Sequence, residues 1–197
     1  MDFGEVVGRR RMVRSYLDVP LPPGSLERIV AAALSAPSAG FAQGQSLVVI
    51  TDASQRSRIA AAGNEQEYVE HGLPPWLSLA PVHIVVTVSE QAYVDRYRET
   101  DKLGPDMEKL PWDVPYWWVD GGTTMMAILL AATNEGLAAG FQGNHNFDGL
   151  GAVLDIPESE KPLGVITIGF AAPDDRARGS VLRGRRPPTD TVHYDRW

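Results

Sequence analysis

VHIVVTV, residues 82–88, is the strongest strand signal in the chain and decides its fold. The run is rich in β-branched residues and follows Pro81, which predicts a buried strand. Two further runs predict buried strands, SLVVIT at 46–51 and LGVITIGFA at 163–171. Predicted helices separate these strands along the chain, so the sequence indicates an α+β or α/β sandwich.

The clearest helix is Ser25–Ala36, because its apolar residues repeat at helical spacing. These residues are Leu26, Ile29, Val30, Ala33 and Leu34. Ser25 is predicted to cap this helix and Pro37 to stop it. A longer helix is predicted over Val119–Asn134, and its apolar character nearly all round favours a central position or a subunit interface.

Shorter elements complete the prediction. Helices are expected at Ser54–Ala62, from a cap at Ser89 to about Asp101, and at Gly149–Leu154. The stretch Leu103–Pro115 contains one glycine and three prolines, which predicts a loop or lid. The chain from Pro173 onward is rich in proline, arginine and aspartate, and we expect it to form an extended arm.

Composition limits the possible functions. The 197 residues predict one domain spanning 1–197, and a formal net charge of −7 argues against a general nucleic-acid binder. The chain has no cysteine, which excludes disulfides and catalytic thiols and fits a cytoplasmic location. No signal peptide is recognisable, and the longest apolar run, Met125–Ala132, is too short to span a membrane. The four histidines are not spaced as metal ligands, so we expect no metal and place His83 in the core.

Positive charge is nevertheless concentrated in two clusters near opposite ends of the chain. GRRRMVRSY at 8–16 and RARGSVLRGRRPP at 176–188 together hold nine of the 18 basic residues. Arginine donates paired hydrogen bonds that suit a phosphate. Between the clusters, APSAGFAQGQ at 36–45 offers small residues and exposed backbone that suit a flat ring. Together they predict a mononucleotide site, with a solvated helix end and an arginine-rich tail as the alternative.

Five segments, taken in order, resemble the nitroreductase superfamily of FMN-dependent oxidoreductases. They are residues 8–52, APVHIVV at 80–86, GLAAGFQGNHN at 136–146, IPESEKPLGVITIGFAAP at 156–173 and GRRPPTDTVHYDRW at 184–197. The resemblance implies an α+β, three-layer sandwich with a central, mostly antiparallel sheet flanked by helices. It also implies an intertwined homodimer with two FMN sites at the subunit interface.

The resemblance also implies which residues bind FMN. Arg10 grips the phosphate and Arg11 follows in the same stretch, while Arg14 lies near the pyrimidine edge of the ring. There a cation stabilises the anionic reduced flavin. Arg183 and Arg185 correspond to a second phosphate-binding pair.

The remaining implied contacts surround the ring. Pro37, Ser38, Ala39 and Phe41 pack on it from the partner subunit, and Gly143 and Asn144 face its hydride-accepting nitrogen. The substrate side is assigned to Phe41, Trp117 and His145. The residues also allow other interpretations: a turn at Gly143, and a core or dimer-interface role for the aromatic cluster of Trp112, Tyr116, Trp117 and Trp118.

Three positions depart from the family pattern. Met12 replaces the usual serine of the phosphate-binding stretch, so one hydroxyl contact is missing. Phe41 stands where asparagine is frequent, and we expect it to stack on the ring or on a substrate, or to fill core. The stretch Gly72–Trp76 replaces residues that hold the pyrimidine edge in many relatives.

The predicted function is hydride transfer from NADPH, NADH or a deazaflavin to an electron-poor acceptor such as a nitroaromatic or a quinone. We assign no catalytic side chain, because the cofactor carries the chemistry and water can supply protons. Other superfamily chemistries stay open: dehalogenation, flavin fragmentation and azoline oxidation. So do a flavin-storage or sensing protein without turnover and an anion-binding interaction module.

Overall fold

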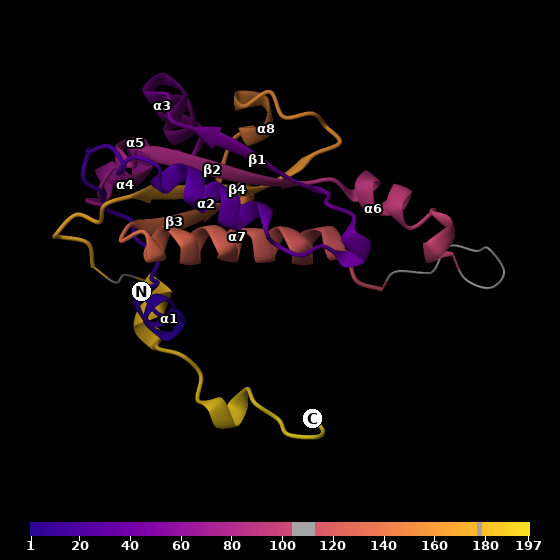
Figure 1. Ribbon diagram of the computed structural model, residues 1–197. Helices are drawn as coiled ribbons and strands as arrows, with labels where there is room; N and C mark the ends of the chain where they lie inside the picture. Colours follow the sequence, from indigo (N-terminus) through magenta and orange to yellow (C-terminus); the bar gives the residue numbers. More distant parts are fainter. Residues whose placement is uncertain (104–112, 177–178) are drawn as a thin grey trace.

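The computed structural model describes residues 1–103, 113–176 and 179–197. The centre of this described part is a four-stranded sheet, shown edge-on in Figure 1. Its strand order is β1-β2-β4-β3, and every neighbouring pair is antiparallel. The strands are β1 (Gln45–Ile50), β2 (Val82–Val88), β3 (Ala138–Gly143) and β4 (Lys161–Gly169). The three predicted strands are therefore confirmed, with their ends moved by two residues or fewer.

Helices cover both faces of this sheet, so the predicted α+β three-layer sandwich is confirmed (Figure 1). One layer is formed by α2 (Ser25–Leu34) and α7 (Tyr116–Asn134). The other contains α3 (Ala53–Ala62), α4 (Glu65–Glu70), α5 (Trp76–Leu79) and α8 (Leu150–Val153). Outside the layers lie α1 (Phe3–Arg9) and α6 (Glu90–Arg96).

The central strand β2 explains why its sequence is continuously apolar. All seven of its residues are buried. Because successive side chains of a strand point to opposite faces, Ile84 packs in the core under α2 and α7 while Val85 packs in the core under α3 and α8. A strand covered on both faces has no solvent side on which to place polar residues.

His83 occupies this same strand and is fully buried, which confirms the predicted core role. Its Nε2 lies 2.7 Å from the carbonyl oxygen of Leu77, so this nitrogen carries the proton and donates to that oxygen. Its Nδ1 is buried without a partner among the described residues. The ring is therefore held neutral, and burial lowers the pKa of His83 from 6.5 to about 4.

His83 should make the protein less stable as the pH falls from about 6.5 to about 4. In that window the unfolded chain binds a proton that the folded chain excludes. The free energy of unfolding therefore falls by about 3 kcal/mol in total across the window. Urea denaturation across the window measures the slope. His83→Gln, which keeps a donor for Leu77, should flatten it; an equally steep slope in this variant would contradict the assignment.

Several predicted boundaries are wrong for local reasons. Gly24, with φ 76°, caps α2 in place of Ser25, whose hydroxyl donates to the carbonyl oxygen of Pro22 at 2.7 Å. The helix after Ser89 ends at Arg96, and a separate 3-10 turn follows at Thr100–Lys102. The long helix α7 begins at Tyr116, so the neighbouring tryptophans belong to its first turn.

The segment Gly136–Asn146 is mostly a strand. We expected a backbone segment or turn here, but Ala138–Gly143 forms the edge strand β3 and only Asn144–Asn146 turns. Alanine and glycine have little strand preference, so pairing with β4 decides this conformation.

The chain after Pro173 forms the exposed arm that we predicted, with short 3-10 turns at Gly179–Arg183 and Pro188–Asp190. Figure 1 shows this arm leaving the sandwich beside α1 and ending away from it. Most of the predicted loop 103–115, including Trp112, lies outside the described residues. Within the described ranges, no helix is long and apolar enough to cross a bilayer, and no group of three or more metal-ligating side chains occurs.

Candidate functional site

Residues 10–16 of the first arginine cluster form an extended segment that lies along the strand β3, whereas Gly8 and Arg9 belong to α1. The Val13 N–H donates to the carbonyl oxygen of Ala139 at 3.0 Å, and the Leu17 N–H donates to that of Phe170 at 2.9 Å. Gly140 permits this approach, since a Cβ atom there would lie 2.3 Å from the Val13 oxygen. The sheet therefore fixes the backbone that carries the arginines.

The side chains of this segment alternate from Met12 to Ser15. Val13 and Ser15 are buried, whereas Met12 and Arg14 are exposed and Arg10 is half-buried. Because alternate residues of an extended segment point to opposite sides, Arg10, Met12 and Arg14 share one side. Among the described residues, no carboxylate pairs with Arg10 or Arg14. Their charge is available to an anion.

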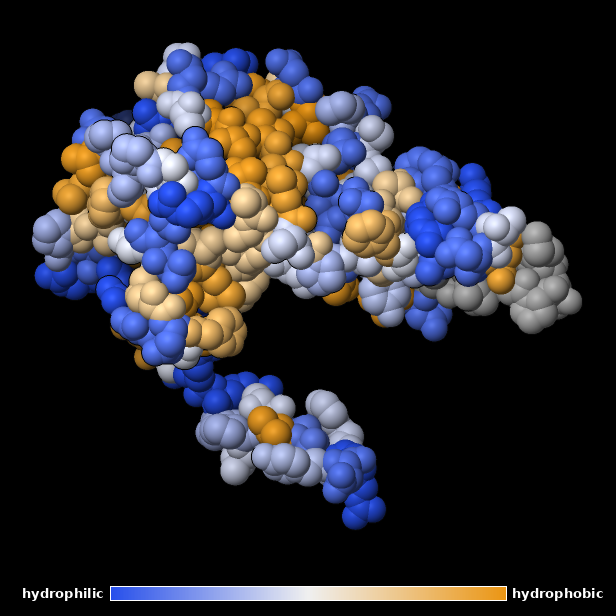
Figure 2. Space-filling view, viewed as in Figure 1, coloured by the Kyte–Doolittle hydropathy of each residue, from blue (hydrophilic) through white to orange (hydrophobic). Residues whose placement is uncertain are grey.

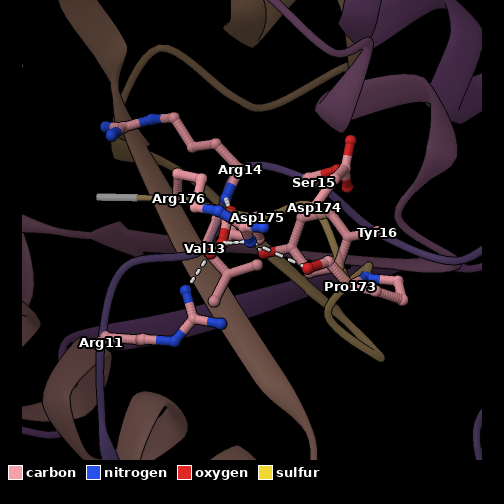
Figure 3. Close-up of polar contacts among 9 residues, drawn as sticks. All are labelled: Arg11, Val13, Arg14, Ser15, Tyr16, Pro173, Asp174, Asp175 and Arg176. Atoms are coloured by element: carbon pink, nitrogen blue, oxygen red, sulfur yellow. Dashed lines mark hydrogen bonds and ion pairs between the residues drawn. The ribbon is translucent and has the colours of Figure 1, made fainter. Parts of the chain in front are cut away.

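Arg11 is held differently, by the acidic pair Asp174 and Asp175 at the root of the arm (Figure 3). Asp175 forms an ion pair with Arg11 and accepts the main-chain N–H of Arg14 at 3.0 Å. Asp174 accepts the hydroxyl of Ser15 at 2.9 Å. In Figure 3 the Arg11 guanidinium points toward Asp175 and that of Arg14 points away. In this conformation Arg11 neutralises a carboxylate, so its predicted role at the phosphate stays a prediction.

Asp175→Ala should lower the free energy of unfolding by about 2 kcal/mol. The Asp175 side chain is only 4% exposed, and the change leaves the Arg14 N–H without its acceptor as well as breaking the ion pair. Arg11→Ala is the matched control, because Arg11 is half-exposed and an exposed charge contributes less than about 1 kcal/mol. Urea denaturation compares them. Equal losses in both variants would show that the carboxylate acts only through the ion pair.

A cavity of about 400 Å³ opens beside Arg14. It is lined by Arg14, Tyr68, Leu73, Pro74, Trp76, Phe141, Gln142, Gly143, Asn146 and Gly179. The Arg14 guanidinium carbon lies 5.3 Å from the centre of the Trp76 ring, and its Nη2 donates to the carbonyl oxygen of Phe141 at 3.5 Å. The indole face and this carbonyl thus hold the cation at the edge of an aromatic cavity.

The floor of this cavity at Gly143 is bare backbone. Opposite it, Gly164 has φ 143°, and a Cβ atom there would lie 2.1 Å from the Gln142 oxygen and 3.0 Å from the Asn144 nitrogen. Glycine at 164 therefore lets the end of β3 lie close to β4. Aromatic side chains, a nearby cation and bare glycine backbone are features that suit a flavin ring, so the residues present fit FMN.

The loop Pro37–Phe41 lies elsewhere in the chain. Pro37, Ser38 and Phe41 line a second cavity, of about 520 Å³, with the end of α2 and part of β1. None of the residues lining it lines the cavity beside Arg14. The single chain therefore does not bring these loop residues to Arg14 and Gly143.

The other predicted residues divide between these places. Trp117 packs edge-on against Tyr93, with ring centres 6.2 Å apart. His145 is exposed in the turn after β3 and lies beside the Arg14 cavity. Its Nδ1 would be 3.0 Å from a Cβ atom on Gly143, and its Nε2 is 3.1 Å from the side-chain amide nitrogen of Asn146.

Arg183 and Arg185 are exposed on the arm, and neither forms an ion pair with a carboxylate of the described residues. Figure 2 shows the end of the arm standing clear of the body, which exposes hydrophobic side chains in this view.

Sequence reasoning missed two residues of this region. Trp76 was noted only as a departure from a pattern, yet it supports the Arg14 guanidinium. One sequence feature could have indicated Asp175: it belongs to an acidic pair between a predicted strand and an arginine cluster. Its partners could not be read from that signal.

Known proteins share this fold and about a quarter of this sequence or less. The model of the nitroreductase family matches residues 7–170. A protein of Methanothermobacter thermautotrophicus named NADH dehydrogenase/NAD(P)H nitroreductase is 25% identical over 201 residues, which cover 100% of this chain and 88% of that protein. The oxygen-insensitive NADPH nitroreductase of Salmonella typhimurium is 26% identical over 197 residues, covering 98% and 73%. A solved structure named FMN-dependent nitroreductase, from Clostridium difficile R20291, superposes with a TM-score of 0.69 at 18% identity over 98% of each chain.

Proposed function

We propose that this chain, which belongs to the nitroreductase family, is an FMN-dependent oxidoreductase. It takes a hydride from NADPH, NADH or a reduced deazaflavin and delivers it to an electron-poor acceptor such as a nitroaromatic or a quinone. The observation that carries the proposal is the cavity in which Arg14, stacked on Trp76, lies beside the bare backbone of Gly143. The names of the Salmonella and Clostridium relatives support the donor and the cofactor.

The residues would divide the work as follows. Bound FMN would supply the hydride exchange. Arg14 would stabilise negative charge on the reduced ring, and the main chain of Gly143 and Asn144 at the end of β3 would lie against the ring. Arg10, with Arg183 and Arg185, binds the phosphate. No side chain is assigned as an acid, because water supplies the proton.

The proposal includes a homodimer. Arg183 and Arg185 lie on an exposed arm, and Pro37–Phe41 lies apart from the Arg14 cavity, so a second chain is needed to complete each site. Apolar side chains of α7 are also exposed, among them Trp118, Val119 and Met126. Light scattering should give twice the mass of the chain, and a monomer at micromolar concentration would contradict a shared site. The cytoplasmic location stays a prediction.

Anaerobic flavin reduction tests the activity. Purified protein loaded with FMN is mixed with NADPH, NADH or reduced deazaflavin, and the flavin absorbance is followed. We expect bleaching by at least one donor and recovery of the absorbance when a quinone is added. Protein that binds FMN but is bleached by none of the donors would favour storage or sensing. Protein that binds no FMN would contradict both the oxidoreductase and the flavin-storage or sensing function. The anion-binding interaction module would then remain.

A further inference from the structure

The loop between α2 and β1 has a backbone that ordinary residues avoid. Phe41 and Gln43 have φ values of 57° and 52°, in the left-handed region, and Gly40 between Ala39 and Phe41 has φ 61°. A left-handed conformation is unfavourable for a residue other than glycine. Two such residues within one short loop require contacts that hold them there.

A buried carboxylate supplies the first of these contacts. Asp120, on α7, is only 6% exposed. One of its oxygens accepts the main-chain N–H of Ala39 at 2.7 Å and the hydroxyl of Tyr93 at 2.6 Å. Among the described residues no cation pairs with it. An acid buried without a counter-cation is unfavourable for folding, so these two donors are what stabilise it.

Tyr93 is a permanent donor in this arrangement. Burial and the acceptor Asp120 both raise the pKa of Tyr93 far above its ordinary value of 10. Its ring also packs edge-on against Trp117. At Gly44, a Cβ atom would lie 2.6 Å from this ring, so the loop lies directly against Tyr93.

A second contact comes from α6. The Arg96 Nε donates to the carbonyl oxygen of Gly40 at 2.8 Å, and Asp101 orients the same guanidinium from 2.8 Å. A Cβ atom at Gly40 would lie 2.7 Å from the Tyr97 ring. The loop is thus fixed from α7 and from α6 together.

These contacts hold the loop in a conformation that exposes the ring of Phe41. Phe41 is 71% exposed, although its neighbours are held by buried groups. A phenyl ring in solvent contributes nothing to this chain's core, so the contacts around it do not serve to bury it. The loop also shares no lining residue with the chain's own Arg14 cavity.

We infer that Asp120 and Tyr93 are positioning residues that hold the loop so that Phe41 projects out of its own subunit and contacts the electron-acceptor at the flavin of the partner subunit. Phe41 then selects flat, electron-poor aromatic acceptors, because a phenyl face stacks on such rings. This inference rests on the proposed function for the acceptor and on the contacts above for the positioning.

The positioning is tested without any flavin. The chain has no cysteine, so Phe41→Cys places a single thiol on the loop for a nitroxide spin label. In apo-protein we expect the spectrum of an ordered label. Tyr93→Phe and Asp120→Ala should each make the label more mobile, whereas Asp120→Asn, which keeps an acceptor oxygen, should not.

Thr87→Val is the matched control. It removes another hydroxyl-to-carboxylate hydrogen bond of 2.6 Å, to Glu160, and should leave the label unchanged. An unchanged label in Tyr93→Phe, or the same increase in Thr87→Val, would overturn the positioning role. Tyr93→Phe keeps the aromatic ring that packs against the loop, so we expect this variant to fold. The test therefore remains possible even if Asp120→Ala does not fold.

The acceptor contact is tested by a double-mutant cycle in the FMN-loaded enzyme. Tyr93→Phe should raise the KM for a quinone about fivefold or more while FMN affinity and the rate of flavin reduction by the donor change little. Phe41→Ala should raise the KM for the quinone at least as much, and the double variant should be no worse than Phe41→Ala alone. Additive effects would overturn the claim that Tyr93 acts through Phe41. If the wild-type protein binds no FMN, the proposed function and the acceptor contact are both wrong. The spin-label experiment would still decide whether Asp120 and Tyr93 position the loop.

Discussion

Arg10→Ala and Arg185→Ala should each weaken FMN binding about tenfold or more, because each removes a charge-assisted hydrogen bond worth about 1.5–3 kcal/mol. Arg10 lies on the same side of its segment as Arg14 and has no carboxylate partner in the described part of the chain. Arg185 lies on the exposed arm and is equally unengaged there. Both charges are thus available for a phosphate.

Quenching of flavin fluorescence on titration measures these affinities. Arg58→Ala is the charge-matched control, since Arg58 lies on α3 and its guanidinium donates to Gln55 at 2.8 Å. It should bind FMN as the wild type does. Unchanged affinity in both Arg10→Ala and Arg185→Ala would remove the phosphate assignment. A loss in Arg10→Ala alone would leave the arm outside the site.

Gly164→Ala should lower the free energy of unfolding by about 3 kcal/mol. Its φ of 143° is unfavourable for alanine, and the new Cβ atom would lie 2.1 Å from the Gln142 oxygen. The same atom would push on Gly143 and on the Asn144 nitrogen, at 2.9 and 3.0 Å. We therefore expect weaker FMN binding in whatever protein still folds.

Gly151→Ala is the control for this change. A Cβ atom on Gly151, in α8, would meet nothing within 4 Å, so the same substitution should leave stability and FMN affinity nearly unchanged. Thermal unfolding and flavin titration give the two results. A Gly164→Ala protein as stable as the wild type would show that β3 and β4 do not need this close approach.

The parts of the fold that could be predicted have strong local signals. Val82–Val88 is β-branched at every position except His83, and the apolar residues of Ser25–Leu34 repeat at helical spacing, so both elements lie where we expected them. The strand β3 has no such signal, because AAGFQG has little strand preference and adopts this conformation through its pairing with β4. Cap identity also depends on backbone angles, which is why Gly24 was missed in favour of Ser25.

The candidate site divides in the same way. The alternation that places Arg10 and Arg14 on one side follows from their spacing and from an extended backbone. The pairing of Arg11 with Asp175 joins residues 164 positions apart, and no local pattern could indicate it. Phe41 was predicted to stack on a ring or fill the core; it does not fill the core, because buried groups from α6 and α7 hold its loop in a conformation that exposes it.

Comparison of FMN with riboflavin tests the central claim most directly. The two ligands share the ring and differ in the phosphate. We propose that arginines from both ends of the chain bind this phosphate. Parallel titrations of the wild-type protein should show FMN binding about tenfold or more tighter than riboflavin. Equal affinity for both, or no binding of either, would contradict the account.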